Sequence, residues 1–128
     1  MVLLALCGCA TSEAAAGLPA LADAEAAGLP ALPDGVYSGE WVTGFETSLF
    51  TPCGTNYRWW MDGAAFEAEG QFFREHPHAD PRALWVSVRG TPSATGPNGH
   101  LGQYSRKLTA REVLELREYR RGDCKKAR

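Results

Sequence analysis

The sequence predicts a small, mainly β domain with one helix, in the order strand-strand-strand-helix-strand-strand. Aromatic residues, which supply much of the burial in small domains, all lie beyond residue 33. Several short segments there alternate apolar and polar residues, as half-buried strands do. One segment between them repeats apolar residues at helical spacing and is closed by a proline. About 90 residues in this region are enough for one domain with a modest core.

The first strand signal runs over residues 35–50. One parity, and therefore one face of a strand, is shared by Tyr37, Trp41, Phe45 and Leu49. Gly44 indicates a bend or bulge at which a long first strand turns into a second. Residues 52–56 have turn composition, and residues 57–61 predict a third strand.

Asp62 is suited to cap a helix that runs to about His76. Helical spacing relates Phe66, Gly70 and Phe73, and Pro77 ends the helix. Residues 84–89 alternate clearly and predict a fourth strand, whose buried side holds Leu84, Val86 and Val88. A loop rich in Gly, Pro, Ser and Asn follows over residues 90–102.

The last element, about residues 108–119, admits two interpretations. One strand face is shared by Leu108, Ala110, Leu114 and Leu116. Thr109 and Glu112 also form a capping box for a helix. We favour a strand, because the element order then matches the OB-fold, a small Greek-key barrel whose helix lies between the third and fourth strands.

The N-terminus predicts a secretion signal. An apolar run, residues 1–6, precedes Leu6-Cys7-Gly8-Cys9, which is similar to the bacterial lipobox in which the final cysteine is lipidated. Cys9 follows Gly8 as that pattern requires, whereas Cys7 follows a leucine. The run is short and no Lys or Arg precedes it, which favours a translation start upstream of Met1; a chance apolar N-terminus on a cytoplasmic protein is the alternative.

The predicted domain organisation has four parts: a signal peptide over residues 1–9, a tether over residues 10–33, an OB-like barrel over residues 34–124 and a basic tail over residues 125–128. The tether repeats AAGLPAL at residues 15–21 and 26–32. Gly and Pro interrupt the alanine runs, so we expect a disordered spacer. No other stretch approaches the ~20 apolar residues of a membrane-spanning helix.

Cys53 and Cys124 are the cysteines that remain after the signal. In an oxidising compartment two remaining thiols tend to pair, so we expect a disulfide between them. A cysteine nucleophile is the alternative, and it would require a positioned histidine and an orienting group.

Ligand-binding candidates lie in the predicted barrel. Trp59 and Trp60 are adjacent, so in a strand they point to opposite faces and one of them reaches the surface. Exposed aromatic residues stack on bases or sugars in OB-folds. The loop residues Asn98, Gly99 and His100 lie where OB-folds often bind ligands, although Asn-Gly is also a turn signal.

A weak metal motif follows the predicted helix. His76, His78 and Asp80 alternate, so in an extended segment they project to one side and resemble a metal-ligand set. His100 is a candidate fourth ligand. The alternative is a solvated loop, since three ligands fall short of a structural zinc site.

Charge is segregated along the chain. Nine basic and four acidic residues lie from Tyr104 onward, against four basic and eleven acidic residues before it. The basic end suits anionic lipid or another phosphate-bearing partner, and a solvated tail that aids solubility is the alternative. No GxSxG, Walker, HExxH or Cys-x-x-Cys motif is present.

Four sequence patterns together resemble small uncharacterised bacterial envelope lipoproteins with an OB-like domain. They are GxYSGxWxxGFExSxFxPC, the triplet at residues 58–60, VxVRG at residues 86–90 and NGHLGxYxRxLTxxEVLEL at residues 98–116. The C-terminal module of NlpE-type lipoproteins is a distant likeness. The resemblance implies the fold and the compartment, and it implies no activity.

These observations predict a lipid-anchored protein of the bacterial cell envelope, with a barrel that serves as a non-catalytic binding or interaction module. Expected partners are the membrane, through the lipid on Cys9, and an envelope protein, glycan or anionic lipid; nucleic acid is not expected. We expect no cofactor. The alternatives are a periplasmic metal-binding protein that uses residues 76–80 and a small hydrolase whose site carries no recognisable motif.

Overall fold

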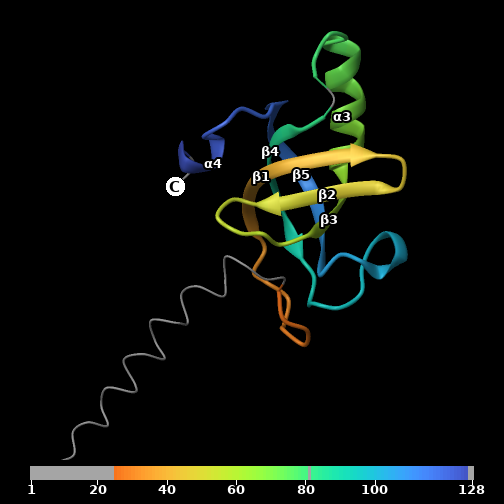
Figure 1. The fold of residues 1–128 in the computed structure, drawn as a ribbon, viewed down its shortest axis with the longest axis vertical. Coiled ribbons are helices and arrows are strands. Elements are labelled where there is room, and N and C mark those ends of the chain that lie inside the picture. Colours follow the sequence, from red (N-terminus) through yellow and green to blue (C-terminus); the bar gives the residue numbers. More distant parts are fainter. Residues whose placement is uncertain (1–24, 81, 127–128) are drawn as a thin grey trace, which may run out of the picture.

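Five strands close into a barrel in the order β1-β2-β3-β5-β4, as the computed structural model shows for residues 25–80 and 82–126 (Figure 1). Only β3 and β5 are parallel neighbours; the other pairs are antiparallel. The elements are β1 (Gly35–Gly44), β2 (Thr47–Pro52), β3 (Trp59–Gly63), α3 (Ala64–Glu75), β4 (Leu84–Pro92), the 3₁₀ turn η1 (His100–Gly102), β5 (Arg106–Glu118) and α4 (Asp123–Lys126). This confirms the prediction of a small OB-like barrel with one long helix.

The last strand, β5, is 13 residues long and pairs with both β3 and β4. The helical alternative for this segment is therefore wrong, because the ladder on each side satisfies its backbone groups. The predicted strand face is right for Leu108 and Ala110 but wrong for Leu114, which is 42% exposed. Two register shifts against β4 reset the alternation, so that Val113 and Leu116 pack on the core.

The hairpin of β1 and β2 also corrects the predicted faces. Tyr37 and Trp41 lie on the core side as expected, and Gly44 ends β1 where a bend was predicted. Phe45 instead occupies the turn and is 90% exposed, because Gly44 pairs with Thr47 and leaves two residues to reverse the chain. The turn resets the alternation, so Phe50 rather than Leu49 is fully buried in β2.

The helix α3 begins later than predicted. Gly63, not Asp62, precedes it, with a φ of 85° that favours glycine. An added Cβ on Gly63 would lie 2.4 Å from the carbonyl oxygen of Ala110 on β5, so this close approach also excludes a side chain. Asp62 remains in β3, where its carboxylate accepts the Gly63 backbone N–H at 2.7 Å.

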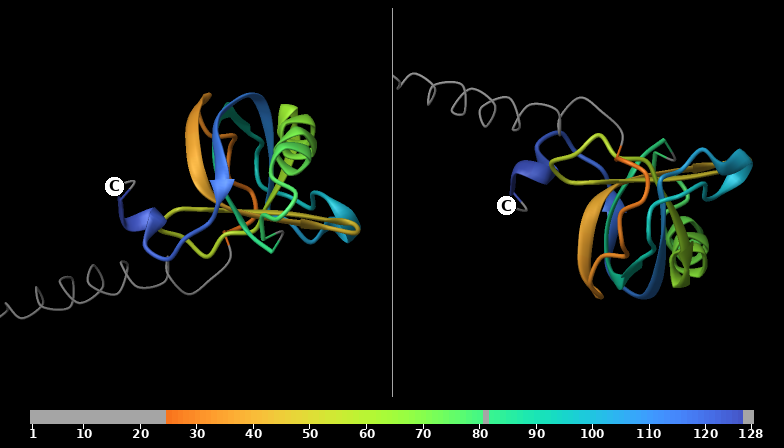
Figure 2. Two further views of the ribbon diagram at one scale, coloured as in Figure 1. Left: turned by 90° about the horizontal axis from the view of Figure 1, so that it is seen from above. Right: turned by 90° about the horizontal axis from the view of Figure 1, so that it is seen from below.

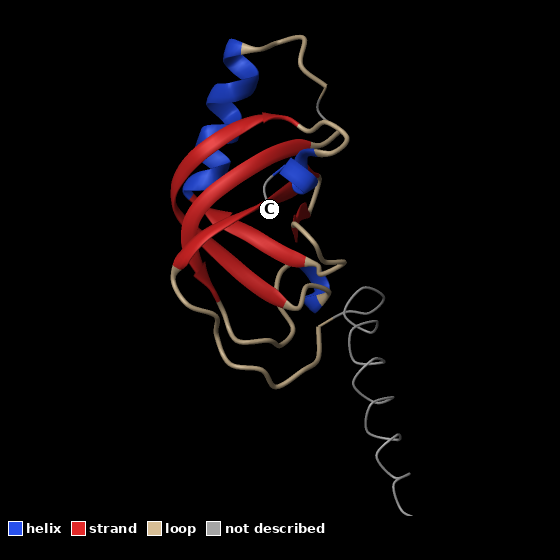
Figure 3. Cartoon of the chain, turned by 90° about the vertical axis from the view of Figure 1, so that its left-hand side faces the viewer, coloured by secondary structure: helices blue, strands red, loops and turns tan. Residues whose placement is uncertain are grey.

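The core fills the barrel with side chains from every strand and from α3. It includes the fourth-strand residues that were predicted to be buried. Its fully buried members are Trp41, Phe50, Trp59, Met61, Ala65, Leu84, Val86, Val88, Leu108 and Ala110. The helix lies at one end of the barrel, and residues 25–34 and the β4–β5 loop lie toward the other (Figure 1 and Figure 3). The β4–β5 loop positions part of the candidate site.

The segment of residues 25–34 packs against the loop end of the barrel, although the sequence predicts a disordered tether up to residue 33. The Glu25 side chain is 5% exposed and forms an ion pair of 2.5 Å with the buried Arg106. Leu32 packs against the core. The folded domain therefore includes residues ahead of the boundary predicted at Asp34. The signal peptide and the rest of the predicted tether lie outside the described residues.

Candidate functional site

The two adjacent tryptophans of β3 lie on opposite sides of the barrel wall. Trp59 is inside, 2% exposed, and its indole Nε1 donates to a Glu25 carboxylate oxygen at 2.7 Å. Trp60 is on the outer side and half-buried. The rings of Trp60 and Tyr104 form a T-shaped pair with centroids 5.0 Å apart. Of the two predicted contact residues, Trp60 is therefore the one that faces outward.

The β4–β5 loop covers part of Trp60. Asn98 and Tyr104 exchange backbone hydrogen bonds of 2.9 and 3.1 Å, which join the two sides of the loop at these residues. The Asn98 amide nitrogen donates to the Gly96 carbonyl at 3.1 Å. Gly99 has a φ of 67° and lies against the Trp60 ring. The predicted ligand-binding loop and the predicted aromatic contact residue are thus packed together.

Replacing Gly99 by alanine is expected to destabilise the domain by about 1–3 kcal/mol, because the new Cβ would lie 2.6 Å from ring atoms of Trp60 and Tyr104. The indole N–H resonance of Trp60 should also shift. Gly96→Ala is the matched control in the same loop, since a Cβ there meets nothing within 4 Å. Equal unfolding free energies for the two variants would contradict the packing described here.

The β1–β2 turn and the β4–β5 loop meet outside the barrel, side by side in both views of Figure 2. His100 Nε2 lies 3.0 Å from a Glu46 carboxylate oxygen, an ion pair when the imidazole is protonated. Beside this pair, Phe45 and Leu101 are 90% and 75% exposed. We call these four residues, Phe45, Glu46, His100 and Leu101, the tip surface.

The tip surface also holds unusual backbone. Among the described residues, Glu46 (φ 55°) and Leu101 (φ 58°) are the non-glycine residues with positive φ. Such conformations cost energy and cluster at functional positions. The sequence prediction included His100 but missed the other three residues. Phe45 was expected on one strand face with Tyr37 and Trp41, and only the turn geometry shows that it is exposed.

The residues of the predicted metal motif are not assembled into a metal site. His76 follows α3, its ring stacks on Phe72 with centroids 4.5 Å apart, and its Nδ1 lies 3.0 Å from the Phe72 carbonyl oxygen. Asp80 forms an ion pair of 2.8 Å with Arg82, whose hydrogen bonds hold the pKa of that carboxyl at about 2. His100 lies with the tip surface, where its partner is Glu46. In residues 25–80 and 82–126, no three His, Cys, Asp or Glu side chains gather as metal ligands would.

The histidine segment instead lines a groove of about 560 Å³ between the end of α3 and the end of β5. Apolar, basic and acidic side chains all face it, and its lining includes Phe72, Glu75, His76, His78, Arg117 and Arg120. Arg117 is already engaged by Asp123 and Glu115. The mixed charges indicate no single ligand chemistry.

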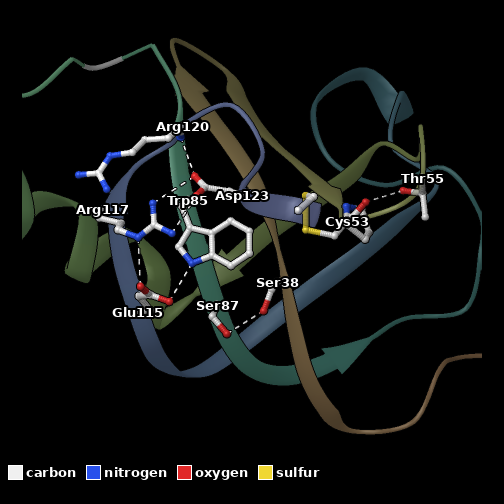
Figure 4. Close-up of a disulfide and its surroundings, with 11 residues drawn as sticks. Ser38, Cys53, Thr55, Trp85, Ser87, Glu115, Arg117, Arg120 and Asp123 are labelled. Atoms are coloured by element: carbon white, nitrogen blue, oxygen red, sulfur yellow. Dashed lines mark hydrogen bonds and ion pairs between the residues drawn. A yellow bond between two sulfur atoms is a disulfide. The ribbon is translucent and has the colours of Figure 1, made fainter. Parts of the chain in front are cut away.

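The predicted disulfide is confirmed. Cys53 follows β2 and Cys124 lies in α4, with their Cα atoms 5.1 Å apart (Figure 4). Next to it, the guanidinium of Arg117 donates to both carboxylate oxygens of Asp123 at 3.1 Å. The disulfide and this ion pair together hold the C-terminal segment against the outside of the barrel.

Acid is expected to weaken the contacts of Glu115 with Trp85 and Arg117, beside this segment. Trp85 donates to Glu115 at 2.9 Å and Arg117 does so at 3.1 Å, and these hydrogen bonds lower the pKa of the Glu115 carboxyl below its usual 4.5. A lowered folded-state pKa contributes stability that is complete above the unfolded pKa and is lost as the pH falls through the folded one. Glu115→Gln should therefore reduce the loss of unfolding free energy between about pH 6 and about pH 3. An unchanged pH dependence in the variant would contradict this role.

None of the helices in the described part of the chain is long and apolar enough to cross a membrane. Cys9 lies outside the described residues, as do the last two residues of the predicted basic tail.

Comparison with known proteins finds no matching family model, no similar curated protein and no similar solved structure.

Proposed function

We propose that this protein is a lipid-anchored protein of the bacterial cell envelope, and that its barrel is a non-catalytic binding module that contacts a phospholipid surface through the tip surface. The lipobox-like sequence that ends at Cys9 supports the anchor. The Cys53–Cys124 disulfide is consistent with an oxidising compartment.

The observation that carries the binding role is the exposure of Phe45 and Leu101 on two loops that contact each other. These are the two most exposed large apolar side chains among the described residues, and they lie on loops joined by the His100–Glu46 contact. Leaving such side chains in water forgoes about 1.5–3 kcal/mol each relative to burial. Neighbouring exposed apolar residues on a folded domain mark an interaction site.

A bilayer fits this surface because the two apolar side chains lie on protruding turns rather than in a groove. Protruding apolar residues insert into the headgroup region, and cations beside them meet the phosphates. Arg58, whose guanidinium lies 5.3 Å from the centre of the Tyr104 ring, supplies such a cation close to the loop. A lipid on Cys9 would keep the barrel near the membrane, so that even a weak contact would orient it.

The anchor is tested by the intact mass of the protein expressed in a bacterium from an upstream start. Cys9→Ala should abolish the added acyl mass and leave the chain unprocessed. Cys7→Ala, the matched control two residues away, should be lipidated normally. Retention of Met1 and absence of acyl mass in the unmodified sequence would rule out the anchor.

The tip surface is tested with the full chain carrying Cys9→Ser, so that no lipid contributes, and with vesicles of phosphatidylethanolamine and phosphatidylglycerol. Phe45→Ser and Leu101→Ser are each expected to lower the partition coefficient about tenfold. Leu114→Ser, which removes a 42% exposed leucine from β5, should leave it unchanged. Equal partitioning of all three variants would overturn the role of the tip surface, as would a preference for isolated peptidoglycan over vesicles.

A further inference from the structure

The segment that packs on the loop end of the barrel contains the second copy of the repeated sequence. AAGLPAL occupies residues 26–32 there and residues 15–21 upstream. In both copies an aspartate follows after one further residue, Asp34 in the described copy and Asp23 upstream. The repeat therefore extends over nine residues, and one copy of it is bound to the barrel.

Backbone groups of the bound copy form hydrogen bonds at defined positions with the end of β4 and the β4–β5 loop. The backbone N–H of Leu29 donates to the hydroxyl of Thr95 at 2.7 Å, and the Thr95 N–H donates to the Leu29 carbonyl at 3.0 Å. The Leu32 N–H donates to the carbonyl of Pro92 at 3.2 Å. These bonds hold residues 29–32 beside the end of β4 and the β4–β5 loop through backbone groups.

Side chains and carbonyls of the bound copy add specificity. Leu32 packs on the core, and the Pro30 carbonyl accepts from Arg106 at 2.8 Å. Asp34 accepts from Thr91 at 2.7 Å and from Arg111 at 2.5 Å, and these hydrogen bonds lower the pKa of the Asp34 carboxyl. Gly28 has a φ of 81°, which favours glycine.

Every one of these positions has the same residue in the upstream copy: Gly17, Leu18, Pro19, Leu21 and Asp23 stand for Gly28, Leu29, Pro30, Leu32 and Asp34. One contact distinguishes the copies. The Glu25 carboxylate accepts from Trp59, Ser105 and Arg106, whereas Ala14 occupies the corresponding upstream position. The upstream copy lacks this carboxylate and therefore its charge-assisted hydrogen bonds. Docking of the upstream copy would also close a loop, which costs chain entropy. Both effects favour the downstream copy.

We infer that the barrel carries a peptide-binding groove for the sequence Gly-Leu-Pro-Ala-Leu-x-Asp, and that the upstream copy, residues 15–23 of the same chain, is its second occupant. An exchange moves the docking point eleven residues toward the N-terminus. If Cys9 is the anchor, as the proposed function has it, the stretch of sequence between the anchor and the docked copy shortens from residues 10–24 to residues 10–14. Its extended reach then falls from about 50 Å to about 17 Å.

The first test is a double-mutant cycle on the full chain, with Cys7→Ser and Cys9→Ser to remove the other thiols. Leu21→Ser alone should leave the folding equilibrium constant unchanged, while Leu32→Ser should lower that constant. In the double variant the constant should be at least threefold lower than the value expected from independent single effects, because the upstream copy can no longer replace the downstream one. The cycle is repeated in a background that also carries Ala14→Glu and Glu25→Ala, which gives the carboxylate to the upstream copy. Additive effects of Leu21→Ser and Leu32→Ser in that background would overturn the inference.

Disulfide trapping supplies the second test, and it does not depend on stability. In the Ala14→Glu, Glu25→Ala background, Thr95→Cys is combined with Leu18→Cys or, as the control outside the repeat, with Ser12→Cys. Leu29 is 40% exposed, so a cysteine at the equivalent Leu18 preserves the packing. Preferential trapping of position 18 within one chain is expected. Equal trapping at both positions, or trapping between two chains, would overturn the inference; neither result depends on lipidation or on the tip surface.

Discussion

Arg106→Ala is expected to lower the free energy of unfolding by about 3–5 kcal/mol, the cost of leaving one partner of a buried ion pair alone. The Arg106 side chain is 2% exposed, and its Nε lies 2.5 Å from Glu25. Its Nη1 also donates to the carbonyls of Pro30 and Ser93 at 2.8 and 2.7 Å. One guanidinium therefore holds residues 25–34, the β4–β5 loop and the start of β5 together. Urea unfolding, monitored by tryptophan fluorescence, measures the loss.

A double variant separates the ion pair from the packing. Glu25→Met combined with Arg106→Met removes both charges and keeps apolar volume, so it should recover part of the loss seen with Arg106→Ala. Glu25→Gln, which keeps an oxygen to accept from Trp59 and Ser105, should cost less than Arg106→Ala. A loss below about 1 kcal/mol for Arg106→Ala would show that residues 25–34 do not depend on this contact.

Loss of the Cys53–Cys124 disulfide is expected to be the second largest effect, about 2–4 kcal/mol. The bridge spans a sequence separation of 71 residues, and a long loop gains much chain entropy in the unfolded state when it is opened. For a domain of this size, each kcal/mol corresponds to about 4–8 °C in Tm. Thermal unfolding of Cys53→Ser with Cys124→Ser, compared with the unmodified chain, measures the shift.

Reduction of the unmodified chain should reproduce the Tm of the double serine variant, and the reductant should not affect that variant. Arg117 and Asp123 still attach the C-terminal segment in the variant. Arg117→Ala should therefore lower the Tm further when the disulfide is absent. An unchanged Tm on reduction would show that the loop-entropy argument does not apply.

The predicted element order and the closure of the barrel are confirmed because each element carries its own local signal. Alternation predicted β4, and its inward residues Leu84, Val86 and Val88 are fully buried. The alternation failed at Phe45 and Leu114, where a turn or a bulge resets which face a residue occupies. Such resets depend on the partner strand, so no local pattern reveals them.

In the candidate site, some residues were predicted from the sequence, but their contacts were found only in the structure. Trp60, Gly99 and His100 were predicted from residue type and position, but the structure pairs them with Tyr104 and Glu46. Glu46 and His100 come from loops 54 residues apart in the sequence, and their contact depends on how the barrel closes.

The fold class, the cysteine pair and the repeated segment could be predicted from the sequence, because periodicity, residue type and identity are local properties. Tertiary contacts bring the turn of Phe45 beside the loop of Leu101 and dock the second AAGLPAL copy on the barrel, and they do not assemble residues 76–80 with His100 as metal ligands. The docking of that copy depends most strongly on tertiary structure. The alanine, glycine and proline content of this segment predicts a spacer. The Glu25 side chain is nevertheless buried, because β3 and the residues at the start of β5 bring three donors to its carboxylate, from Trp59, Ser105 and Arg106. The energy of such a contact depends on groups distant in the chain, and only the folded barrel brings them together.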